Sequence, residues 1–463
     1  MPLSTLAPFV HLLGKTRVLQ GEALAARYAH IWQQDKSLKV KALLLPRNTD
    51  EVSGIMRICH QHRQAVVMHG GLTNLVGGTE ASQDLVVIST EKMNQIEEID
   101  PASRSITVQA GVILETVQEA VKEQQLFFPL NFGAKGSAQI GGIIATNAGG
   151  LRVFRYGMTR QLVLGLEAVL ADGTVISSMK KLIKDNSGYD LRQLFIGSEG
   201  TLGIVTRAVL KLVEAPRSRV SAWVALAHYD RVVDFLKFMD GGMAGTLSGF
   251  ELMWEPTFIT QSSPPATVKA PIPYGHPYYV LLEGLGSDQA QDQERMISLL
   301  EKALAEGIIL EAAPASSESE RLRFWKVREE VDVMAFQTPH PQQFDISLPI
   351  PLIGEVIAEI RAELERIPEV VVVHSFGHVA DGNIHILVGK SEQNQALIDQ
   401  INEVVYRPLT AIGGSVSAEH GIGEDKKPYL SYCRTEAEIQ LMRHLKRSLD
   451  PFNLLNPGKL LSM

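Results

Sequence analysis

Two histidines near residue 380 flank a turn sequence and could bind one metal ion. The segment 374–385 has the sequence HSFGHVADGNIH, in which Asp381-Gly382 separates two runs of β-type residues. Asp-Gly favours a two-residue hairpin turn, and this turn would place His378 directly opposite His385. Side chains that oppose one another in this way have Cβ atoms about 4.5–5.5 Å apart. The spacing therefore allows a shared metal ion, and a pair of buried structural histidines is the alternative interpretation.

Glu419, in the segment SAEHGIG, is a candidate third ligand. Two histidines and one carboxylate leave coordination positions open for substrate, as a catalytic metal site requires. The glycines after His420 would let the chain bend into a cleft. Zinc and manganese both suit such ligands, and the residue types do not choose between them.

Glycine-rich loops are the second feature with evident chemistry. Of the 38 glycines, 13 lie within residues 133–203 and four within 70–78. Consecutive small residues let several backbone N–H groups face one anion. Ser137, Thr146 and Asn147 add side-chain donors, so a phosphate-binding role is favoured over simple tight turns. Neither GxGxxG after a strand nor a P-loop motif is present, which excludes the two most familiar phosphate-binding signatures.

Hydrophobic patterning predicts two regions with different texture. In the first half, strands are predicted at 40–45, 65–68, 85–88 and 106–109, with helices at 49–63 and 111–124. Beyond Pro216, strands are predicted at 218–226, 278–283, 344–348 and 370–376, with helices at 229–239, 288–306, 317–335 and 352–366. This second order indicates a sheet covered by helices on one face. We therefore divide the chain into 1–215, 216–415 and a C-terminal segment, 416–463, that includes a helix at 436–449.

The composition excludes several classes of protein. The chain has 463 residues, with 52 acidic and 44 basic side chains and no basic stripe with interleaved aromatics, which argues against nucleic acid as a partner. No apolar run is long enough for a transmembrane helix, and the N-terminus is a poor signal peptide. Two distant cysteines, Cys59 and Cys433, fit a reducing compartment, so we expect a cytoplasmic protein. A homodimer is left open.

Four motifs resemble the FAD-binding region of the vanillyl-alcohol-oxidase-type flavoproteins, most closely D-2-hydroxyglutarate and D-lactate dehydrogenases. They are PLNFGAKGS at 129–137, ATNAGG at 145–150, the stretch 151–157, and GSEGTLGIV at 197–205. The resemblance continues into the C-terminal half and covers nearly the whole chain. It implies an α+β fold, with a two-subdomain FAD-binding domain of that type and an α/β substrate (cap) domain that has an antiparallel sheet.

The same resemblance implies which residues contact FAD. The first two glycine loops would hold the pyrophosphate and flavin, the stretch from Glu199 would lie near the adenosine, and Asn456 of the NPGK tail would return to the flavin edge. Relatives that tether FAD through the first loop have a histidine where Thr73 stands. His69 precedes the glycines, so non-covalent FAD is expected and His69 is interpreted as an ordinary loop histidine. The implied FAD-binding residues are Gly70, Gly71, Leu72, Thr73, Asn74, Leu75, Ser137, Gly141, Gly142, Thr146, Asn147, Gly149, Gly150, Glu199, Gly200, Gly203, Ile204 and Asn456.

The resemblance also implies an activity, the oxidation of a D-2-hydroxy acid to the 2-oxo acid by hydride transfer to flavin. Electrons would pass to a carrier such as electron-transfer flavoprotein or a quinone and not to NAD. Relatives with the arrangement GHxxDGNxH…EHG use the residues matching His378, His385 and Glu419 as metal ligands, and the one matching His420 as the base. Arg328 matches an arginine that binds the substrate carboxylate. The residue pattern alone would favour a solvated helix charge paired with Asp332, four residues on.

Three positions depart from the hydroxyglutarate-specific pattern. The family has Thr where Asp332 stands, Lys in place of Gln343 and Asn in place of Leu387. The first two changes remove a cation and add an anion near the expected distal carboxylate, so a second substrate carboxylate would be held less well. D-lactate, D-malate and other D-2-hydroxy acids stay open as substrates. A metal-independent flavin enzyme of the same fold and a non-catalytic FAD-holding subunit are the alternative hypotheses.

Overall fold

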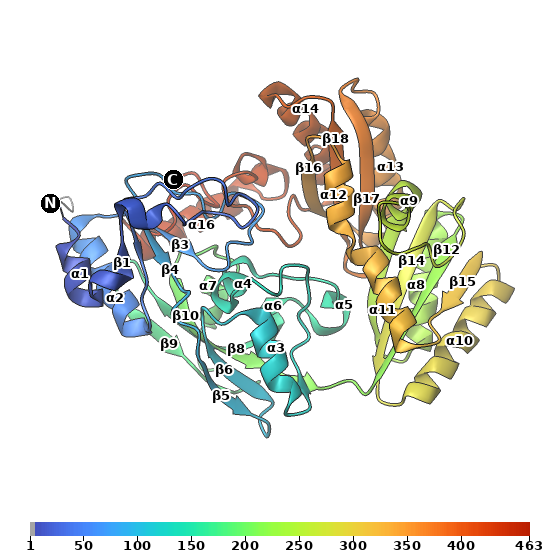
Figure 1. Cartoon of the computed structure of the whole chain (residues 1–463), viewed down its shortest axis with the longest axis horizontal. Coiled ribbons are helices and arrows are strands. Elements are labelled where there is room, and N and C mark those ends of the chain that lie inside the picture. The colour runs from blue at the N-terminus through green and yellow to red at the C-terminus, as the bar shows by residue number, and fades with distance from the viewer. Residues whose placement is uncertain (1–4) are drawn as a thin grey trace. The chain divides into compact units, whose positions relative to one another are not determined.

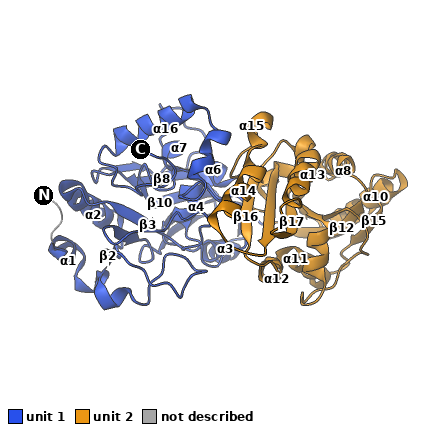
Figure 2. Ribbon diagram, turned by 90° about the horizontal axis from the view of Figure 1, so that it is seen from above, with its two compact units in different colours: residues 1–149, 157–215, 419–463 blue, residues 150–156, 216–418 orange. Residues whose placement is uncertain are grey.

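The computed structural model describes residues 5–463, and the chain divides into two compact units. Unit 1 runs to Gly149 and continues through Gly157–Ala215 and Glu419–Met463 (Figure 2). Unit 2 contains Gly150–Tyr156 and Pro216–Ala418. The chain therefore leaves unit 1 for seven residues, beginning with Gly150 at the end of the second glycine loop, an excursion that the sequence pattern did not indicate.

Unit 1 contains two main sheets (Figure 1). The first has the order β1-β2-β4-β3, and its strands β2, β4 and β3 are parallel. The second has the order β5-β6-β10-β8-β9 and is antiparallel throughout. The strands of the first are β1 (Val18–Leu19), β2 (Ala42–Leu44), β3 (Val66–His69) and β4 (Val86–Ser89); those of the second are β5 (Ile96–Asp100), β6 (Ser105–Gln109), β8 (Val163–Val169), β9 (Val175–Ser178) and β10 (Ile204–Lys211).

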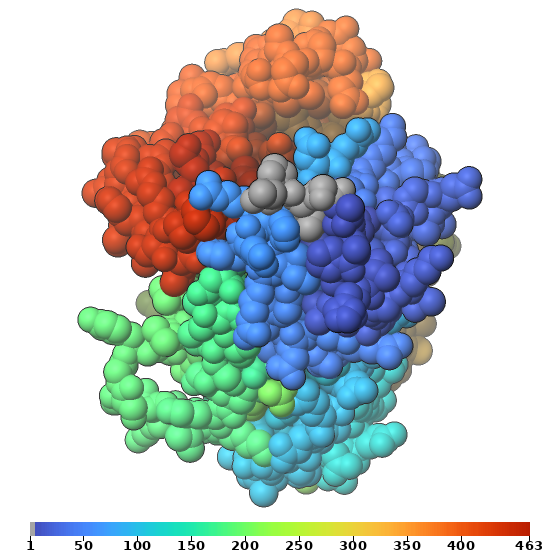
Figure 3. Space-filling model, turned by 90° about the vertical axis from the view of Figure 1, so that its left-hand side faces the viewer, coloured from blue at the N-terminus to red at the C-terminus, as the bar shows by residue number. Residues whose placement is uncertain are grey.

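Each sheet of unit 1 is covered by helices whose apolar residues follow a helical period. Helix α2 (Thr49–His62) begins at Asn48, whose side chain accepts the N–H of Glu51, and packs Ile55 and Met56 against the parallel strands. Helices α3 (Leu114–Lys122) and α4 (Ile140–Thr146) cover the antiparallel sheet. The segment 179–191 that follows β9 projects from the unit as the light-green arm in Figure 3, with Ile183 and Tyr189 strongly exposed.

Unit 2 is built on one seven-stranded sheet with the order β15-β12-β14-β13-β17-β18-β16. All its neighbouring strands are antiparallel, as the resemblance implied for the substrate domain. The strands are β12 (Ser218–Leu226), β13 (Leu247–Trp254), β14 (Tyr278–Gly286), β15 (Glu311–Pro314), β16 (Gln342–Ser347), β17 (Val370–His378) and β18 (Asn383–Lys390).

Helices cover both faces of this sheet, so the prediction of a single covered face was wrong. One face packs Trp223 and Tyr279 against α9 (Glu255–Ser262), α11 (Glu318–Glu329) and α12 (Val331–Gln337). The other carries α8 (Tyr229–Gly242), α10 (Gln289–Ala305), α13 (Ile353–Leu364) and α14 (Gln395–Tyr406). Figure 2 shows α11 and α12 on the opposite side of the strands from α8 and α13. The central strands are buried at nearly every position, which is the pattern of a sheet that is covered twice.

The predicted helix 317–335 is interrupted in the structure. Glu330, with ψ 36°, separates α11 from α12. Helix α9 is one that the sequence analysis did not predict. No helix of the described residues is both long and apolar enough to cross a membrane.

The C-terminal segment of unit 1 is fixed by a buried lysine. Helix α16 (Glu436–Leu449) begins with a capping box between Thr435 and Glu438. Near its end, Lys446 Nζ donates to Asp450 Oδ2 at 2.6 Å and to the carbonyls of Thr201 and Leu455 at 2.9 and 2.8 Å. One ammonium group therefore joins the C-terminal tail to the loop that precedes β10.

Replacing Lys446 should destabilise the protein strongly. The substitution Lys446→Met removes the cation and leaves the buried Asp450 carboxylate uncompensated, a change that typically costs about 3–5 kcal/mol. The matched control is Arg447→Met at the exposed next position of α16, expected to cost less than about 1 kcal/mol. Urea unfolding followed by circular dichroism measures both free energies, and equal values for the two variants would contradict the assignment.

Candidate active site

The first glycine loop follows β3 and is shaped by its own polar side chains. Asn74 Oδ1 accepts the N–H of Gly78 at 2.8 Å, and its amide donates to Thr79 Oγ1 at 2.6 Å. His69 is buried beside the carbonyl of Thr79, at 2.9 Å from Nε2, and burial lowers the pKa of its imidazole to about 4. His69 is therefore a neutral, structurally engaged histidine at physiological pH.

The first and second glycine loops approach each other at Gly71. A Cβ added there would lie 2.0 Å from the carbonyl oxygen of Ser137, so no larger residue fits without a shift of backbone. Leu72, directly after it, has a left-handed φ of 58°. This close approach brings Gly71 and Ser137, two of the implied FAD-binding residues, into contact.

The second glycine loop contains helix α4. Its Gly141 N–H donates to the carbonyl of Ala110 at 2.7 Å, and an added Cβ would lie 2.8 Å from the Ala110 side chain. Thr146 Oγ1 donates to the carbonyl of Gly142 at 3.0 Å, and Asn147 ends the helix with a φ of 50°. Gly141 is thus required for packing, whereas a Cβ at Gly142 would meet no described atom within 4 Å.

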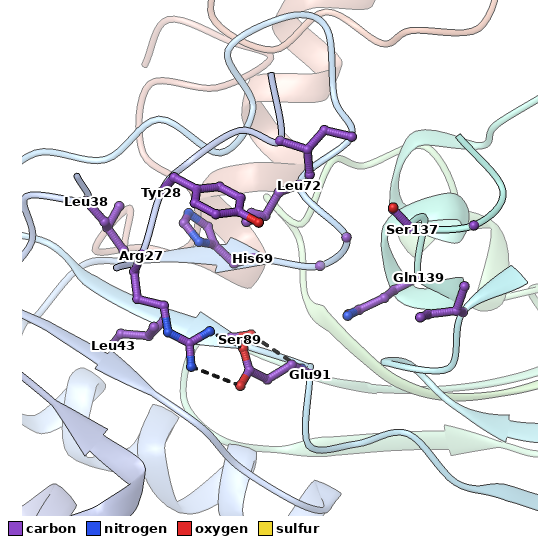
Figure 4. Close-up of a pocket in the computed structure, with 15 residues that line it drawn as sticks. Arg27, Tyr28, Leu38, Leu43, His69, Leu72, Ser89, Glu91, Ser137 and Gln139 are labelled. Carbon is purple, nitrogen blue, oxygen red and sulfur yellow. Dashed lines mark hydrogen bonds and ion pairs between the residues drawn. The ribbon is translucent and has the colours of Figure 1, made fainter. Parts of the chain in front are cut away.

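A cavity of about 280 Å³ lies where the two loops meet (Figure 4). The loops line it with Gly70, Gly71, Gly136 and Ser137. This open space, bounded by glycine backbone, fits the phosphate-binding role inferred for the loops. Further lining residues have no motif and were missed by the sequence analysis; they include Tyr28 and the ion pair of Arg27 and Glu91, with Arg27 Nη1 at 2.7 Å from a carboxylate oxygen.

The side chains of Glu199 and Asn456 form hydrogen bonds with backbone groups of unit 1. Glu199, at a left-handed φ of 51°, accepts the N–H groups of Ile422 and Gly423, each at 2.7 Å, and burial raises the pKa of its carboxyl. Asn456 donates to the Glu199 carbonyl at 2.6 Å and accepts the N–H of Met68 at 2.9 Å. The loop after His420 is therefore anchored to the GSEGTLG motif.

The remaining implied FAD-binding residues lie in or beside these loops. A Cβ at Gly200 would lie 2.7 Å from Asn456 Nδ2, and one at Gly203 would lie 2.7 Å from the Phe195 ring. Ile204 is the first residue of β10 and packs in the core beside the parallel sheet. Leu75 is exposed. Thr73 lies in the irregular segment after β3, and Gly149 and Gly150 lie in the one after α4.

The hairpin of β17 and β18 differs in register from its prediction. His378 pairs with Asn383 and His385 pairs with Phe376, so the two histidines are diagonal neighbours and not direct partners. Residues Val379–Asp381 form a 3-10 turn, and Gly382, at φ 85°, closes a connection longer than the predicted two residues. A Cβ on Gly382 would lie 2.5 Å from the Leu348 carbonyl, so packing against the end of β16 imposes the longer turn. The imidazole centroids still lie 5.5 Å apart.

The two histidines belong to a group that could hold a metal ion. His378, His385 and Glu419 each offer a ligand atom, and these atoms lie within 4.8 Å of one another; Asp345, His385 and His420 form an overlapping group. Glu419 and His420 directly follow Ala418, the last residue of unit 2. The structure therefore brings together all four residues that the sequence analysis selected for this chemistry.

Asp345 organises the approach to Glu419 and was missed by the sequence analysis. It is fully buried on β16 and accepts from Asn383 Nδ2 at 2.8 Å and from the N–H of Ala418 at 3.1 Å. Its carboxylate also lies 3.8 Å from Nδ1 of His385, its cross-strand partner. The sequence signal that could have identified Asp345 is an acidic residue between the apolar Phe344 and Ile346 of one strand.

Glu251, also missed, links His378 to Arg328. It is fully buried on β13, with Oε1 at 2.6 Å from His378 Nδ1, while Arg328 Nε donates to Oε2 at 2.8 Å. Burial opposes ionisation of Glu251, but its interactions with His378 and Arg328 outweigh burial and bring its pKa below the ordinary value. Arg328 is buried and its guanidinium lies 4.8 Å from the Phe376 ring centroid. The solvated pairing with Asp332 considered above is therefore wrong.

The three positions that depart from the hydroxyglutarate pattern have different environments. Leu387 is buried in the apolar cluster with Phe376 and Trp325. Gln343 lies opposite it on β16 and is exposed, as is Asp332 on α12. The two polar positions are thus accessible, whereas Leu387 contributes to the core of unit 2.

Comparison with known proteins gives matches along most of the chain. A family model described as FAD binding domain matches residues 40–178, and one described as FAD linked oxidases, C-terminal domain, matches residues 215–460. The chain is 38% identical to the mitochondrial D-2-hydroxyglutarate dehydrogenase of Bos taurus over 421 residues, 91% of this chain and 77% of that protein. It is 38% identical to the D-2-hydroxyglutarate dehydrogenase of Xanthomonas citri pv. viticola over 440 residues, 94% of this chain and 92% of that protein.

Solved structures with little sequence similarity share the fold. A 4-ethylphenol oxidase from Gulosibacter chungangensis superposes with a TM-score of 0.74 at 18% identity, covering 98% of this chain and 96% of that one. p-Cresol methylhydroxylase superposes with a TM-score of 0.73 at 14% identity, covering 98% and 95%. These likenesses confirm the predicted α+β architecture of the vanillyl-alcohol-oxidase type.

The substitution Gly71→Ala should impair FAD binding. The added methyl would displace the Ser137 backbone and separate the two glycine loops, and we expect FAD affinity to fall at least about tenfold, or roughly 1.4 kcal/mol. Titration of apoprotein with FAD, followed by flavin fluorescence, measures the change. Gly133→Ala is the control, because a Cβ there would meet no described atom within 4 Å; equal affinities for both variants would contradict the role of the close approach.

Proposed function

This chain belongs to the family of FAD-linked oxidases, and from that premise we propose that it oxidises a small D-2-hydroxy acid to the 2-oxo acid with a divalent metal and a histidine base. The family matches confirm the resemblance predicted from the motifs. The observation that carries the proposal is the group formed by His378, His385 and Glu419. The buried Arg328 is linked to this group because Glu251 binds both Arg328 and His378. Such a set combines metal ligands with a carboxylate-binding group.

FAD is proposed to bind non-covalently along the glycine loops of unit 1. The approach of Gly71 to Ser137 and the cavity beside it fit the pyrophosphate part of the cofactor. Thr73 stands where relatives with tethered flavin have histidine, and the buried His69 is engaged by Thr79. When bound, FAD supplies the acceptor for the hydride that leaves the substrate Cα.

A divalent metal, zinc or manganese, is proposed at His378, His385 and Glu419. Two imidazoles and one carboxylate are a donor set that suits either ion and leaves coordination positions for substrate. Such an ion would supply a Lewis acid that lowers the pKa of the substrate hydroxyl. Asp345 lies close enough to His385 Nδ1 to favour the orientation of that ring.

His420 and Arg328 are proposed to act on the substrate directly. His420 adjoins the proposed ligand Glu419 and would remove the hydroxyl proton, which typically contributes about 10²–10⁴ in rate. Arg328 uses Nε for Glu251, and within the described part of the chain its two terminal nitrogens make no hydrogen bond. Those nitrogens would bind the substrate carboxylate in a bidentate manner.

The substrate class follows from the exposed positions Asp332 and Gln343. An anion and a neutral amide there would hold a second carboxylate weakly, so we propose a preference for a monocarboxylic D-2-hydroxy acid such as D-lactate over D-2-hydroxyglutarate. We further propose electron-transfer flavoprotein or a quinone as the electron acceptor. Both cysteines are free, in agreement with the proposed cytoplasmic location, although the Bos taurus relative is named as mitochondrial.

Dye reduction by a panel of D-2-hydroxy acids tests the function. The FAD-loaded protein should reduce an artificial acceptor, lose that activity after chelation, and regain it with zinc or manganese. His420→Asn should lower kcat by about 10²–10⁴ with FAD content unchanged, whereas His444→Asn, at an exposed position of α16, should not. Full activity after complete metal removal would favour the metal-independent alternative, and no turnover of any acid would favour the FAD-holding subunit.

The double substitution Asp332→Thr, Gln343→Lys should shift specificity toward D-2-hydroxyglutarate. The change removes an anion and adds a cation at accessible positions. We expect the ratio of kcat/KM for D-2-hydroxyglutarate to that for D-lactate to rise about tenfold, equivalent to roughly 1.4 kcal/mol of discrimination. Gln337→Lys, at an exposed position of α12, adds a cation as a control. An equal shift in both variants would mean that any added cation attracts the dianionic substrate, and it would contradict a specific role of positions 332 and 343.

A further inference from the structure

We propose that Glu251 is a positioning residue that orients the metal-binding His378 and the substrate-binding Arg328 through the two oxygens of one carboxylate. The inference rests on the functions proposed above for those two residues. Glu251 lies on β13, in register with His378 on β17, and all three residues belong to unit 2. The sequence pattern assigned Glu251 no role, because it stands alone in the strand LSGFELMW.

The first oxygen determines which nitrogen of His378 can bind a metal. Oε1 of Glu251 lies 2.6 Å from Nδ1 of His378. An ionised carboxylate can only accept hydrogen bonds, so the proton of the neutral imidazole must be on Nδ1. The lone pair is then on Nε2, the nitrogen that would act as the metal ligand. A carboxylate in this position also raises the basicity of the ligating ring.

The second oxygen restricts the guanidinium of Arg328. Nε donates to Oε2 at 2.8 Å, and the guanidinium carbon lies 4.8 Å from the centroid of the Phe376 ring. A planar group held by Nε on one edge and an aromatic ring on its face cannot rotate freely. Its two terminal nitrogens therefore keep one direction. Glu251 thus connects the proposed metal ligand to the proposed carboxylate clamp without contacting substrate itself.

Glu283 shows what a purely structural carboxylate does in the same sheet. It lies on the adjacent strand β14 and is equally buried, and Gly249, two residues before Glu251, is its cross-strand partner. Its oxygens bind Arg152 at 2.9 and 3.3 Å, Ser248 Oγ at 3.1 Å, and lie 3.8 Å from Arg321. Among its described partners there is no histidine. Glu283 is therefore the matched control for loss of a buried, arginine-paired carboxylate.

The test compares Glu251→Gln with Glu283→Gln in the FAD-loaded, metal-depleted protein. Gln can donate from its amide to His378 Nδ1, which would shift the proton to Nε2. Titration calorimetry with zinc alone and manganese alone should give about 10–100-fold weaker binding for E251Q, and affinity close to the wild type for E283Q. With cobalt substituted, the visible absorption of E251Q should also differ from that of the wild type.

Steady-state kinetics at saturating metal test the second half of the proposal. The KM for the hydroxy acid should rise about tenfold in E251Q, by more than kcat falls, because Arg328 loses its orientation. Flavin content and the melting temperature identify misfolded protein. If E251Q cannot be obtained with FAD, Glu251→Asp takes its place, since it keeps the charge but withdraws the oxygens, and it should weaken metal binding as well.

Two outcomes would overturn the inference in distinguishable ways. A wild-type protein that binds neither zinc nor manganese contradicts the proposed metal site, and the role of Glu251 with it. A wild-type protein that binds metal, together with an E251Q variant of equal metal affinity and equal KM, contradicts the role of Glu251 alone. Equal losses in E251Q and E283Q would also overturn it, because they would reduce the effect to loss of a buried charge.

Discussion

A carboxylate buried inside a sheet must find partners for its charge, and this constraint organises unit 2. Desolvating an unpaired carboxylate costs several kcal/mol, so such groups are paired or protonated. The strands of unit 2 bury Glu251, Glu283 and Asp345. Each gathers donors from other strands, helices or loops, and the donors of Glu251 and Asp345 include the candidate metal ligands or the backbone that leads to them. The contacts of Glu251 and Asp345 thus restrict the positions of the candidate ligands His378 and His385 and of the backbone at Ala418.

A different constraint, close backbone approach, organises the loops of unit 1. Gly71 approaches Ser137 and Gly141 approaches Ala110 at distances that no Cβ would tolerate. The glycines therefore have two roles. Some allow close packing of one backbone segment against another, whereas others, such as Gly142, have open space where a side chain would lie. Glu199 and Asn456, distant in sequence, then join the GSEGTLG motif, β3 and the loop after His420.

Local signals in the sequence were sufficient for the antiparallel hairpin and the glycine loops. Glu419 was grouped with His378 and His385 by the ligand types that a catalytic metal site requires and by the family resemblance. The register of the hairpin was not predictable, because the packing of Gly382 against the Leu348 carbonyl determines the length of the turn. Glu251 was also out of reach, since its partner His378 is 127 residues away and only the sheet order brings them together. The burial of Arg328 has the same origin: helical spacing suggests Asp332 as its partner, but tertiary packing provides Glu251.

The segment 150–156 directly follows a glycine of the second loop and also contains the partner of a buried carboxylate of unit 2. The chain enters unit 2 at Gly150, the second glycine of the pair that ends the second loop, and returns to unit 1 at Gly157. Within unit 2, Arg152 binds Glu283, and Arg155 donates to the carbonyls of Thr246 and Leu285. This peptide is therefore hydrogen-bonded to β14, which carries Glu283, and to Thr246, the residue directly before β13. The segment that follows the second glycine loop is therefore held within unit 2 by the same strand, β14, that carries the buried Glu283.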